Sequence, residues 1–128
     1  MNLLLDTHIF LWLNQQPEKL SPHVLALCED SKNTLYLSHV SPWEIQIKIK
    51  LGKLDLHSPL QDMIATQQRD NNLQLLPIAL KHIYALADLE NYHQDLFDRL
   101  LIAQATVESM PLITVDSKII QYPIVTIS

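Results

Sequence analysis

Glycine and cysteine are almost absent from this 128-residue chain, which has one of each, Gly52 and Cys28. The loops that cradle nucleotide phosphates in Walker and dinucleotide-binding folds need several glycines, so we expect no nucleotide cofactor of these kinds. One thiol can form neither an internal disulfide nor a cysteine-based zinc site. A chain of this length buries a full hydrophobic core without such crosslinks, and we expect residues 1–128 to form a single domain.

Positive charge is also scarce. The chain has 9 lysines and arginines against 14 aspartates and glutamates, which gives a net charge of −5 with neutral histidines. This is the opposite sign from a protein that binds nucleic acid through its overall charge. Any contact with nucleic acid must therefore be local.

Long apolar runs are missing as well. The first five residues lead directly into Asp6, without the basic region or cleavage site of a signal peptide. No stretch reaches the roughly 18 apolar residues that a membrane helix needs. We therefore expect a soluble, cytoplasmic protein with no membrane partner.

Short apolar segments alternate with segments of helical spacing along the whole chain. The short segments are mostly apolar on both faces, which is typical of buried parallel strands. This alternation predicts an α/β fold, a three-layer α/β/α sandwich around a central, mostly parallel sheet. The expected strands are 3–5, 34–38, 73–76, 112–115 and 124–127, and the expected helices are 8–14, 22–29, 42–51, 59–71, 80–89 and 95–109.

Three of the expected helices begin with a serine followed by a proline. Ser21, Ser41 and Ser58 each have the position of an N-cap, with proline as the first helical residue. The segment after Ser41 also alternates apolar and polar residues with the period of a half-buried strand. We predict a helix there, because Ser41 and Glu44 have the spacing of a capping box.

The helix predicted over residues 42–51 is apolar on two opposite faces. A helix of this kind needs two neighbours, so we expect one face to meet the core and the other to meet a partner chain. At about 100° per residue, Trp43, Ile47, Leu51 and Leu54 share one face, and Ile45 and Ile49 lie nearly opposite.

Two aspartates directly follow predicted strands. Asp6 ends the first strand and precedes Thr7, and Asp116 ends the fourth and precedes Ser117. Because the carboxyl ends of parallel strands share one edge of a sheet, where ligands bind, the two carboxylates can converge there. The alternative is structural: each aspartate caps the helix that follows it.

Glu44 and Asp98 stand in the first turns of two predicted helices and would complete a cluster of four carboxylates. Each also has a structural alternative, since Glu44 can pair with Lys48, and Asp98 can pair with Arg99 or face the helix dipole behind an Asp95 N-cap. Four neighbouring carboxylates raise one another's pKa values unless cations neutralise them. Hard divalent ions take such oxygen ligands, so the pattern indicates Mg²⁺ or Mn²⁺.

At these residues the chain resembles the PIN-domain proteins, specifically the VapC-type ribonuclease toxins of bacterial toxin–antitoxin pairs. Any one matching block is a weak motif, but four in the family's order, over nearly the whole chain, are a strong one. Leu96 stands where the family usually has proline, which weakens the helix start slightly and removes no ligand. The blocks are LDTH at 5–8, SHVSPWEI at 38–45 continuing to KLGKL at 50–54, HQDLFDRLLIAQA at 93–105, and TVD at 114–116.

The resemblance implies a metal-dependent endoribonuclease, usually a homodimer, that a cognate antitoxin protein holds inactive. It implies that Asp6, Glu44, Asp98 and Asp116 form the catalytic and metal-binding group, with the Thr114 hydroxyl beside them. We expect Asp6, Asp98 and Asp116 to hold Mg²⁺ or Mn²⁺ and Glu44 to be a more peripheral ligand or a base that orients water.

Residues near these motifs are expected to support the site or to contact RNA. Thr7 and Thr114 can orient the carboxylates through hydrogen bonds. The six histidines show no metal-ligand spacing, and we assign none to a metal. The nearest basic residues, which either contact the RNA backbone or form a solvated helix face, are Arg99, Lys48, Lys50 and Lys53.

Two other functions compete with the ribonuclease. A phosphatase with an aspartate nucleophile is disfavoured, because Asp6 has no second aspartate two residues further on. A PIN-like scaffold that binds RNA or protein without cutting is the main alternative. The presence of all four carboxylates argues against it.

Overall fold

A computed structural model describes all residues from 1 to 128 and contains one five-stranded sheet. Every strand pairing is parallel, and the strand order is β3-β2-β1-β4-β5, so the first strand of the chain lies at the centre. All five expected strands are confirmed, although the last two are two residues long rather than four. The strands are β1 (Asn2–Leu5), β2 (Thr34–Ser38), β3 (Gln74–Leu76), β4 (Leu112–Ile113) and β5 (Thr126–Ile127).

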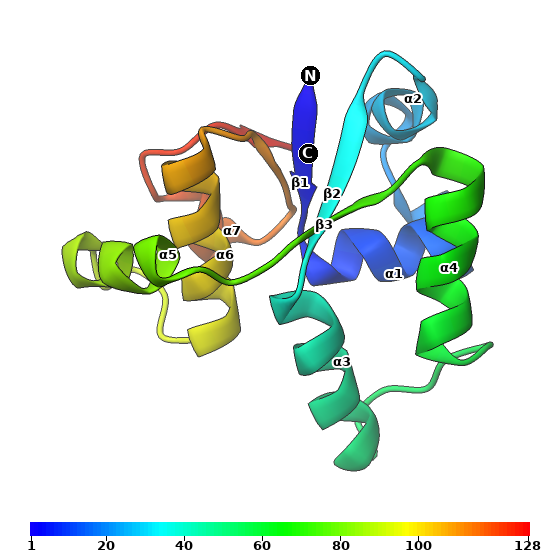
Figure 1. The fold of residues 1–128 in the computed structure, drawn as a ribbon, viewed down its shortest axis with the longest axis horizontal. Helices are drawn as coiled ribbons and strands as arrows, with labels where there is room; N and C mark the ends of the chain where they lie inside the picture. Colours follow the sequence, from blue (N-terminus) through cyan, green and yellow to red (C-terminus); the bar gives the residue numbers. More distant parts are fainter.

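Helices cover both faces of the sheet and complete the predicted three-layer sandwich (Figure 1). On one face lie α1, α2 and α4, and on the other lie α5, α6 and α7. None of the helices is both long enough and apolar enough to cross a membrane. The helices are α1 (Thr7–Gln15), α2 (Pro22–Glu29), α3 (Val40–Lys50), α4 (Leu60–Asn71), α5 (Leu80–Ala85), α6 (Leu96–Glu108) and α7 (Ser117–Ile120).

The core consists of two apolar clusters, one on each face of the sheet. Side chains of a strand point alternately to its two faces, and β1 divides its leucines accordingly. Leu3 and Leu5 belong to the cluster under α1, α2 and α4, whereas Leu4 belongs to the cluster that includes α6 residues such as Leu101. All three strand leucines are fully buried, which explains why the strand is apolar on both faces.

Only one of the three predicted serine caps is confirmed. The Ser21 hydroxyl accepts the backbone N–H of Val24 at the start of α2. Helix α3 begins two residues earlier than predicted, at Val40, so Ser41 lies inside the helix and its side chain is free for another contact. At α4 the N-cap residue is Pro59, one residue after Ser58, and no side chain caps the helix.

The helix predicted over residues 80–89 is shorter than its apolar pattern suggests. Its regular part, α5, ends at Ala85, and a turn of 3-10 helix over Leu86–Asp88 follows. The aspartates that precede α1, α6 and α7 cap these helices as expected. Asp6 accepts the N–H of Thr7, and Asp95 and Asp116 do the same for α6 and α7.

Helix α3 lies beyond the carboxyl ends of β1 and β2 (Figure 1). The core face carries Ile45, which is fully buried, while Trp43 is 53% exposed and packs edge-on against Phe97 with ring centres 5.1 Å apart. The prediction that one apolar face of this helix meets the core is confirmed, and contact of the other face with a partner chain stays a prediction. The helix ends at Lys50, and Gly52, just beyond the C-cap Leu51, has a φ of +71°, the left-handed conformation that often follows a helix end.

The two faces of α3 predict unequal effects of the same truncation. Ile45→Ala removes a fully buried side chain, and we expect a loss of about 2–4 kcal/mol of unfolding free energy. Ile47→Ala, on the opposite face at a position 37% exposed, is the matched control and should cost no more than about 1 kcal/mol. Urea unfolding followed by circular dichroism measures both, and equal losses would contradict the assignment of the core face.

Candidate active site

Asp6 stands directly after β1 and is held by hydrogen bonds on both of its oxygens. The backbone N–H of Thr7 donates to Oδ1 at 2.7 Å, and the hydroxyl of Thr114, just after β4, donates to Oδ2 at 2.7 Å. The side chain is buried, and burial raises its pKa above the usual 3.8 although both hydrogen bonds act in the opposite direction. Asp6 is therefore fixed in orientation at the centre of the sheet's carboxyl edge.

Glu44 approaches the same edge from α3. Its Oε1 accepts the Thr7 hydroxyl at 2.8 Å, and its Oε2 accepts the Lys48 ammonium at 2.7 Å. The Thr7 oxygen also lies 2.8 Å from the Ser41 hydroxyl. Because Thr7 gives its one proton to Glu44, Ser41 is the donor of this second bond. Ser41 thus orients Glu44 through Thr7 rather than capping the helix.

Asp98 lies in the first turn of α6, whose N-cap is Asp95. The Asp95 side chain accepts the backbone N–H of Asp98 at 3.0 Å. The Asp98 carboxylate does not pair with Arg99, as one alternative predicted, but lies 2.8 Å from Nε2 of His93. The loop before α6 therefore brings a histidine into the carboxylate cluster.

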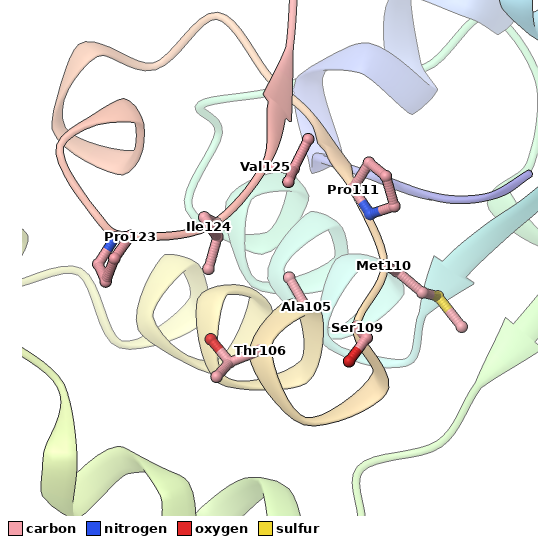
Figure 2. A pocket seen from close by; sticks show the side chains of 8 residues that line it. All are labelled: Ala105, Thr106, Ser109, Met110, Pro111, Pro123, Ile124 and Val125. Atoms are coloured by element: carbon pink, nitrogen blue, oxygen red, sulfur yellow. The ribbon is translucent and has the colours of Figure 1, made fainter.

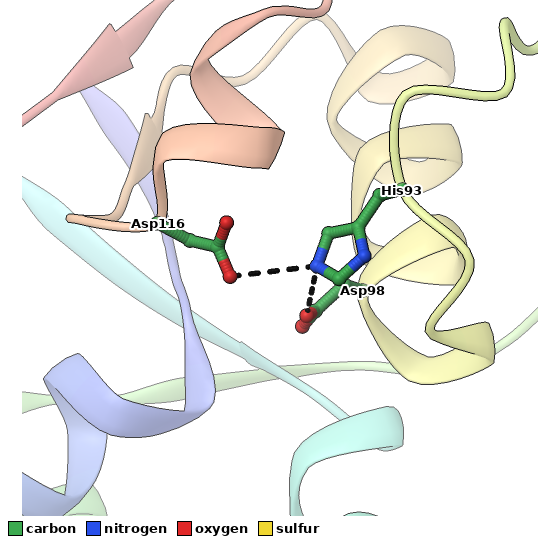
Figure 3. A group of neighbouring side chains, drawn as sticks. All are labelled: His93, Asp98 and Asp116. Atoms are coloured by element: carbon green, nitrogen blue, oxygen red, sulfur yellow. Dashed lines mark ion pairs between the residues drawn. The ribbon is translucent and has the colours of Figure 1, made fainter.

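Asp116 completes the cluster from the loop after β4. Its Oδ1 caps α7, and its Oδ2 lies 3.4 Å from Nε2 of His93 (Figure 3). The hydroxyl of Thr114 accepts the backbone N–H of Asp116 at 3.1 Å while donating to Asp6. One threonine therefore sets the relative position of the two aspartates.

Electrostatics show that the four carboxylates act on one another. The pKa of Asp98 rises to about 8, chiefly because the side chain is buried and then because of the surrounding negative charges. The charges that raise it belong to Asp6, Asp95, Glu44 and Asp116. The structure thus brings together four carboxylates from distant parts of the sequence.

Carboxylate oxygens in this arrangement fit a hard divalent cation. Such ions take oxygen ligands and bind through a few carboxylates, with water and substrate oxygens completing the shell. Oxygens of Asp98 and Asp116 and a ring nitrogen of His93 lie within 4.8 Å of one another. A bound cation would lower the raised pKa of Asp98 and so favour the ionised form of its carboxyl group.

The sequence matches the model of the PIN domain family over residues 3–125, which is nearly the whole chain. This chain belongs to the PIN-domain family. A search of curated protein sequences finds no match.

Solved structures of similar fold agree with a PIN domain. VapBC2 from Rickettsia felis, bound to a DNA fragment from their promoter, includes a chain similar at a TM-score of 0.72 and 18% identity, with 99% of this chain and 98% of that chain covered. VapBC-1 from nontypeable Haemophilus influenzae includes a chain similar at a TM-score of 0.69 and 18% identity, with 100% of this chain and 98% of that chain covered. A toxin–antitoxin complex from Klebsiella pneumoniae includes a chain similar at a TM-score of 0.62 and 18% identity, with 98% of this chain and 95% of that chain covered.

Of the four basic residues expected to contact RNA, two are held by other groups of the protein and two are exposed. Lys48 is held by Glu44, and although burial acts to lower its pKa, the hydrogen bond and the charge of Glu44 raise it overall. Arg99 donates through Nη1 to backbone carbonyls of the loop before α6 rather than to any carboxylate. Lys50 and Lys53 are exposed and form no ion pair.

A cavity of about 260 Å³ lies away from the carboxylates, between the C-terminal end of α6 and the start of β4 (Figure 2). Thr106 and Ser109 supply its hydroxyl groups, and Met110 and Pro123 are among its apolar walls. It contains no titratable side chain. This cavity is therefore separate from the cluster of carboxylates at the edge of the sheet.

Sequence reasoning missed two side chains at the site of this PIN domain. Ser41 carries no signal, since its place before proline is that of an N-cap. His93 was rejected for want of ligand spacing, although it stands two residues before Asp95, which caps the helix that carries Asp98. Its position two residues before the N-cap places the ring near the first turn of α6, and this spacing is the sequence feature that could have predicted the contact with Asp98.

The raised pKa of Asp98 predicts a stability that falls with rising pH. Since the pKa of about 8 in the folded protein exceeds the usual 3.8, the folded state holds this proton between about pH 4 and pH 8 and the unfolded state does not. Ionising Asp98 therefore costs stability over that window. Asp98→Asn should stabilise the metal-free protein at pH 8 by about 2 kcal/mol and have a much smaller effect at pH 4.

Urea unfolding in EDTA at the two pH values tests this prediction. Asp55→Asn, at an exposed loop position, is the control and should change stability by less than about 0.5 kcal/mol. A wild-type protein as stable at pH 8 as its Asp98→Asn variant would show that ionising Asp98 costs the folded protein no stability.

Proposed function

We propose that this PIN-domain protein is a metal-dependent endoribonuclease that acts in the cytoplasm as the toxin of a toxin–antitoxin pair. The observation that carries the proposal is the clustering of Asp6, Glu44, Asp98 and Asp116 at one edge of the sheet, where burial and then the neighbouring negative charges raise the pKa of Asp98 to about 8. Strongly perturbed pKa values of this kind are concentrated at functional sites, and a cation site for phosphodiester hydrolysis accounts for these carboxylates.

Asp6, Asp98 and Asp116 are the residues that would hold Mg²⁺ or Mn²⁺. Glu44 is more peripheral, because Thr7 and Lys48 already occupy its two oxygens. When bound, the ion supplies a Lewis acid that lowers the pKa of water and stabilises charge on a phosphate. Fixed by its two hydrogen bonds, Asp6 needs no rearrangement to present its remaining lone pairs.

Lys50 and Lys53 are the best candidates for contact with the RNA backbone. Both are exposed and unpaired near the end of α3, the helix that also carries Glu44. Lys48 and Arg99 are already engaged within the protein, so we assign them no direct phosphate contact. Two lysines provide the local positive charge that an acidic protein requires for nucleic acid.

The partners proposed for this chain are an antitoxin protein and a second copy of itself. Structures of similar fold are VapBC and toxin–antitoxin complexes, which supports an antitoxin partner here. The surface supports protein contact as well. An apolar groove of about 460 Å³, beside the exposed Trp43, includes Ile83, Leu86, Leu96 and Phe97 in its walls, and exposed patches of this kind mark protein interfaces.

Loss of the carboxylates should abolish RNA cleavage without loss of the fold. Asp6→Asn and Asp98→Asn each remove one negative oxygen, and we expect cleavage of a labelled single-stranded RNA in Mg²⁺ or Mn²⁺ to fall about 100-fold or more. EDTA should abolish cleavage by the wild type, and Mn²⁺ should restore it.

Asp62→Asn, at an exposed position in α4, is the matched control, since it removes the same charge from a helix that supplies no site residue and should retain full activity. Circular dichroism shows whether each variant is folded. Retained cleavage in both Asp6→Asn and Asp98→Asn would reject the nuclease, and a folded wild type that binds no Mn²⁺ at millimolar concentration would favour a silent scaffold.

The toxin role is tested in cells. Induction of the wild type should arrest bacterial growth, and induction of Asp6→Asn should not. Co-expression of the protein encoded by the neighbouring reading frame should relieve the arrest if that protein is the antitoxin. Normal growth on induction of a protein that cleaves RNA in vitro would separate the nuclease from the toxin role.

A further inference from the structure

His93 has a ring nitrogen inside the carboxylate site that no protein group satisfies. The residue is 91% buried, with a relative exposure of 9%. Its Nε2 lies 2.8 Å from Asp98 Oδ2 and 3.4 Å from Asp116 Oδ2, yet neither oxygen is aligned to form a hydrogen bond with it (Figure 3). A buried polar atom without a partner is costly, and in a functional site it indicates a missing ligand.

The opposite ring nitrogen fixes which atom carries the proton. Nδ1 of His93 accepts the backbone N–H of Asp95 at 3.3 Å. In a neutral imidazole one nitrogen accepts and the other donates, so the proton lies on Nε2 and is directed into the site. Histidines that bind metals through Nε2 instead donate from Nδ1 to an acceptor. Proximity alone would admit His93 as an ion ligand, but its hydrogen bonding indicates a donor.

The loop that carries His93 is anchored at several points. The His93 backbone N–H donates to the Tyr122 hydroxyl at 3.0 Å, and that hydroxyl donates to the Glu90 carbonyl at 2.6 Å. Nη1 of Arg99 donates to the carbonyls of Glu90 and His93, both at 3.0 Å. The position of the ring is thus preset by the protein, as a donor that acts on a developing charge requires.

We infer that His93 donates a hydrogen bond from Nε2–H to a phosphate oxygen of the RNA strand bound in the carboxylate site. The inference rests on the proposed nuclease function and adds a residue that touches the substrate. A phosphodiester has two unesterified oxygens and accepts such a donor readily. The N–H orients the phosphate between Asp98 and Asp116 and stabilises the negative charge that grows on it during attack by water.

Kinetics on a short mixed-sequence RNA with a fluorophore and a quencher test the inference. His93→Ala should lower kcat about 10- to 100-fold at saturating Mg²⁺, because the donor acts on the transition state. His93→Gln, whose amide N–H can donate, should recover part of this loss. His23→Ala, at an exposed position in α2, is the matched control and should keep the wild-type kcat.

Two measurements that do not depend on cleavage distinguish a donor from an ion ligand. Calorimetry with Mn²⁺ should give dissociation constants for the wild type and His93→Ala that agree within about twofold. Nitrogen NMR of the Mg²⁺-loaded protein should show the His93 proton on Nε2. A tenfold weaker Mn²⁺ affinity in His93→Ala, or a proton on Nδ1, would overturn the inference in favour of a metal ligand.

The outcomes separate this inference from the proposed function. If the wild type cleaves RNA and the folded His93→Ala variant has the same kcat, the proposed nuclease function stands and the role of His93 is overturned. A wild type that cleaves nothing in Mg²⁺ or Mn²⁺ overturns the nuclease itself, and the inference with it. Should His93→Ala fail to fold, His93→Gln gives the comparison: measurable cleavage together with a wild-type Mn²⁺ affinity supports the donor, and an Mn²⁺ affinity about tenfold weaker opposes it.

Discussion

The crowding of carboxylates at one edge of the sheet is the constraint on which the rest of this structure depends. The pKa of Asp98 rises to about 8, first because its side chain is partly buried and then because four neighbouring carboxylates are negatively charged, so the folded protein resists its ionisation. The fold must supply enough burial energy elsewhere to hold these groups together. The two apolar clusters on either face of the sheet do so, and they hold β1 and β4 in the register that places Asp6 beside Thr114.

Hydroxyl groups link the elements that carry these carboxylates. Thr114 links the loop after β4 to Asp6, and Thr7 links α1 to Glu44 and Ser41 in α3. Each threonine hydroxyl donates to a carboxylate and accepts from a second group, so Asp6 and Glu44 are both held by neutral donors. Short neutral side chains can do this in a crowded acidic site, where further charged groups would add desolvation cost.

Much of the fold was predictable because its strands are buried on both faces. A run such as Leu3–Leu4–Leu5 has few alternatives to a central parallel strand, and the strand boundaries followed from it. Helix starts were less predictable, since a serine before proline fits an N-cap whether or not the helix begins earlier, as it does at Val40. The apolar period likewise gave no sign that the helix at 80–89 would break at Ala85.

The site was predictable in its carboxylates but not in its other parts. Asp6 and Asp116 follow strands, and the topology of a parallel sheet brings such residues to one edge. The contact between Asp98 and His93 depends instead on the path of a loop, which has no periodicity. The same is true of Arg99. Its side chain donates hydrogen bonds to the backbone of that loop and to the hydroxyl of Tyr122, a residue far along the chain.

Helix α3 joins the two sides of the molecule that matter for function. Trp43 faces outward beside the apolar groove, and its neighbour Glu44 faces inward to Thr7. The two side chains are neighbours in one helix, so any displacement of α3 as a rigid element would move the wall of the groove and the acidic edge together.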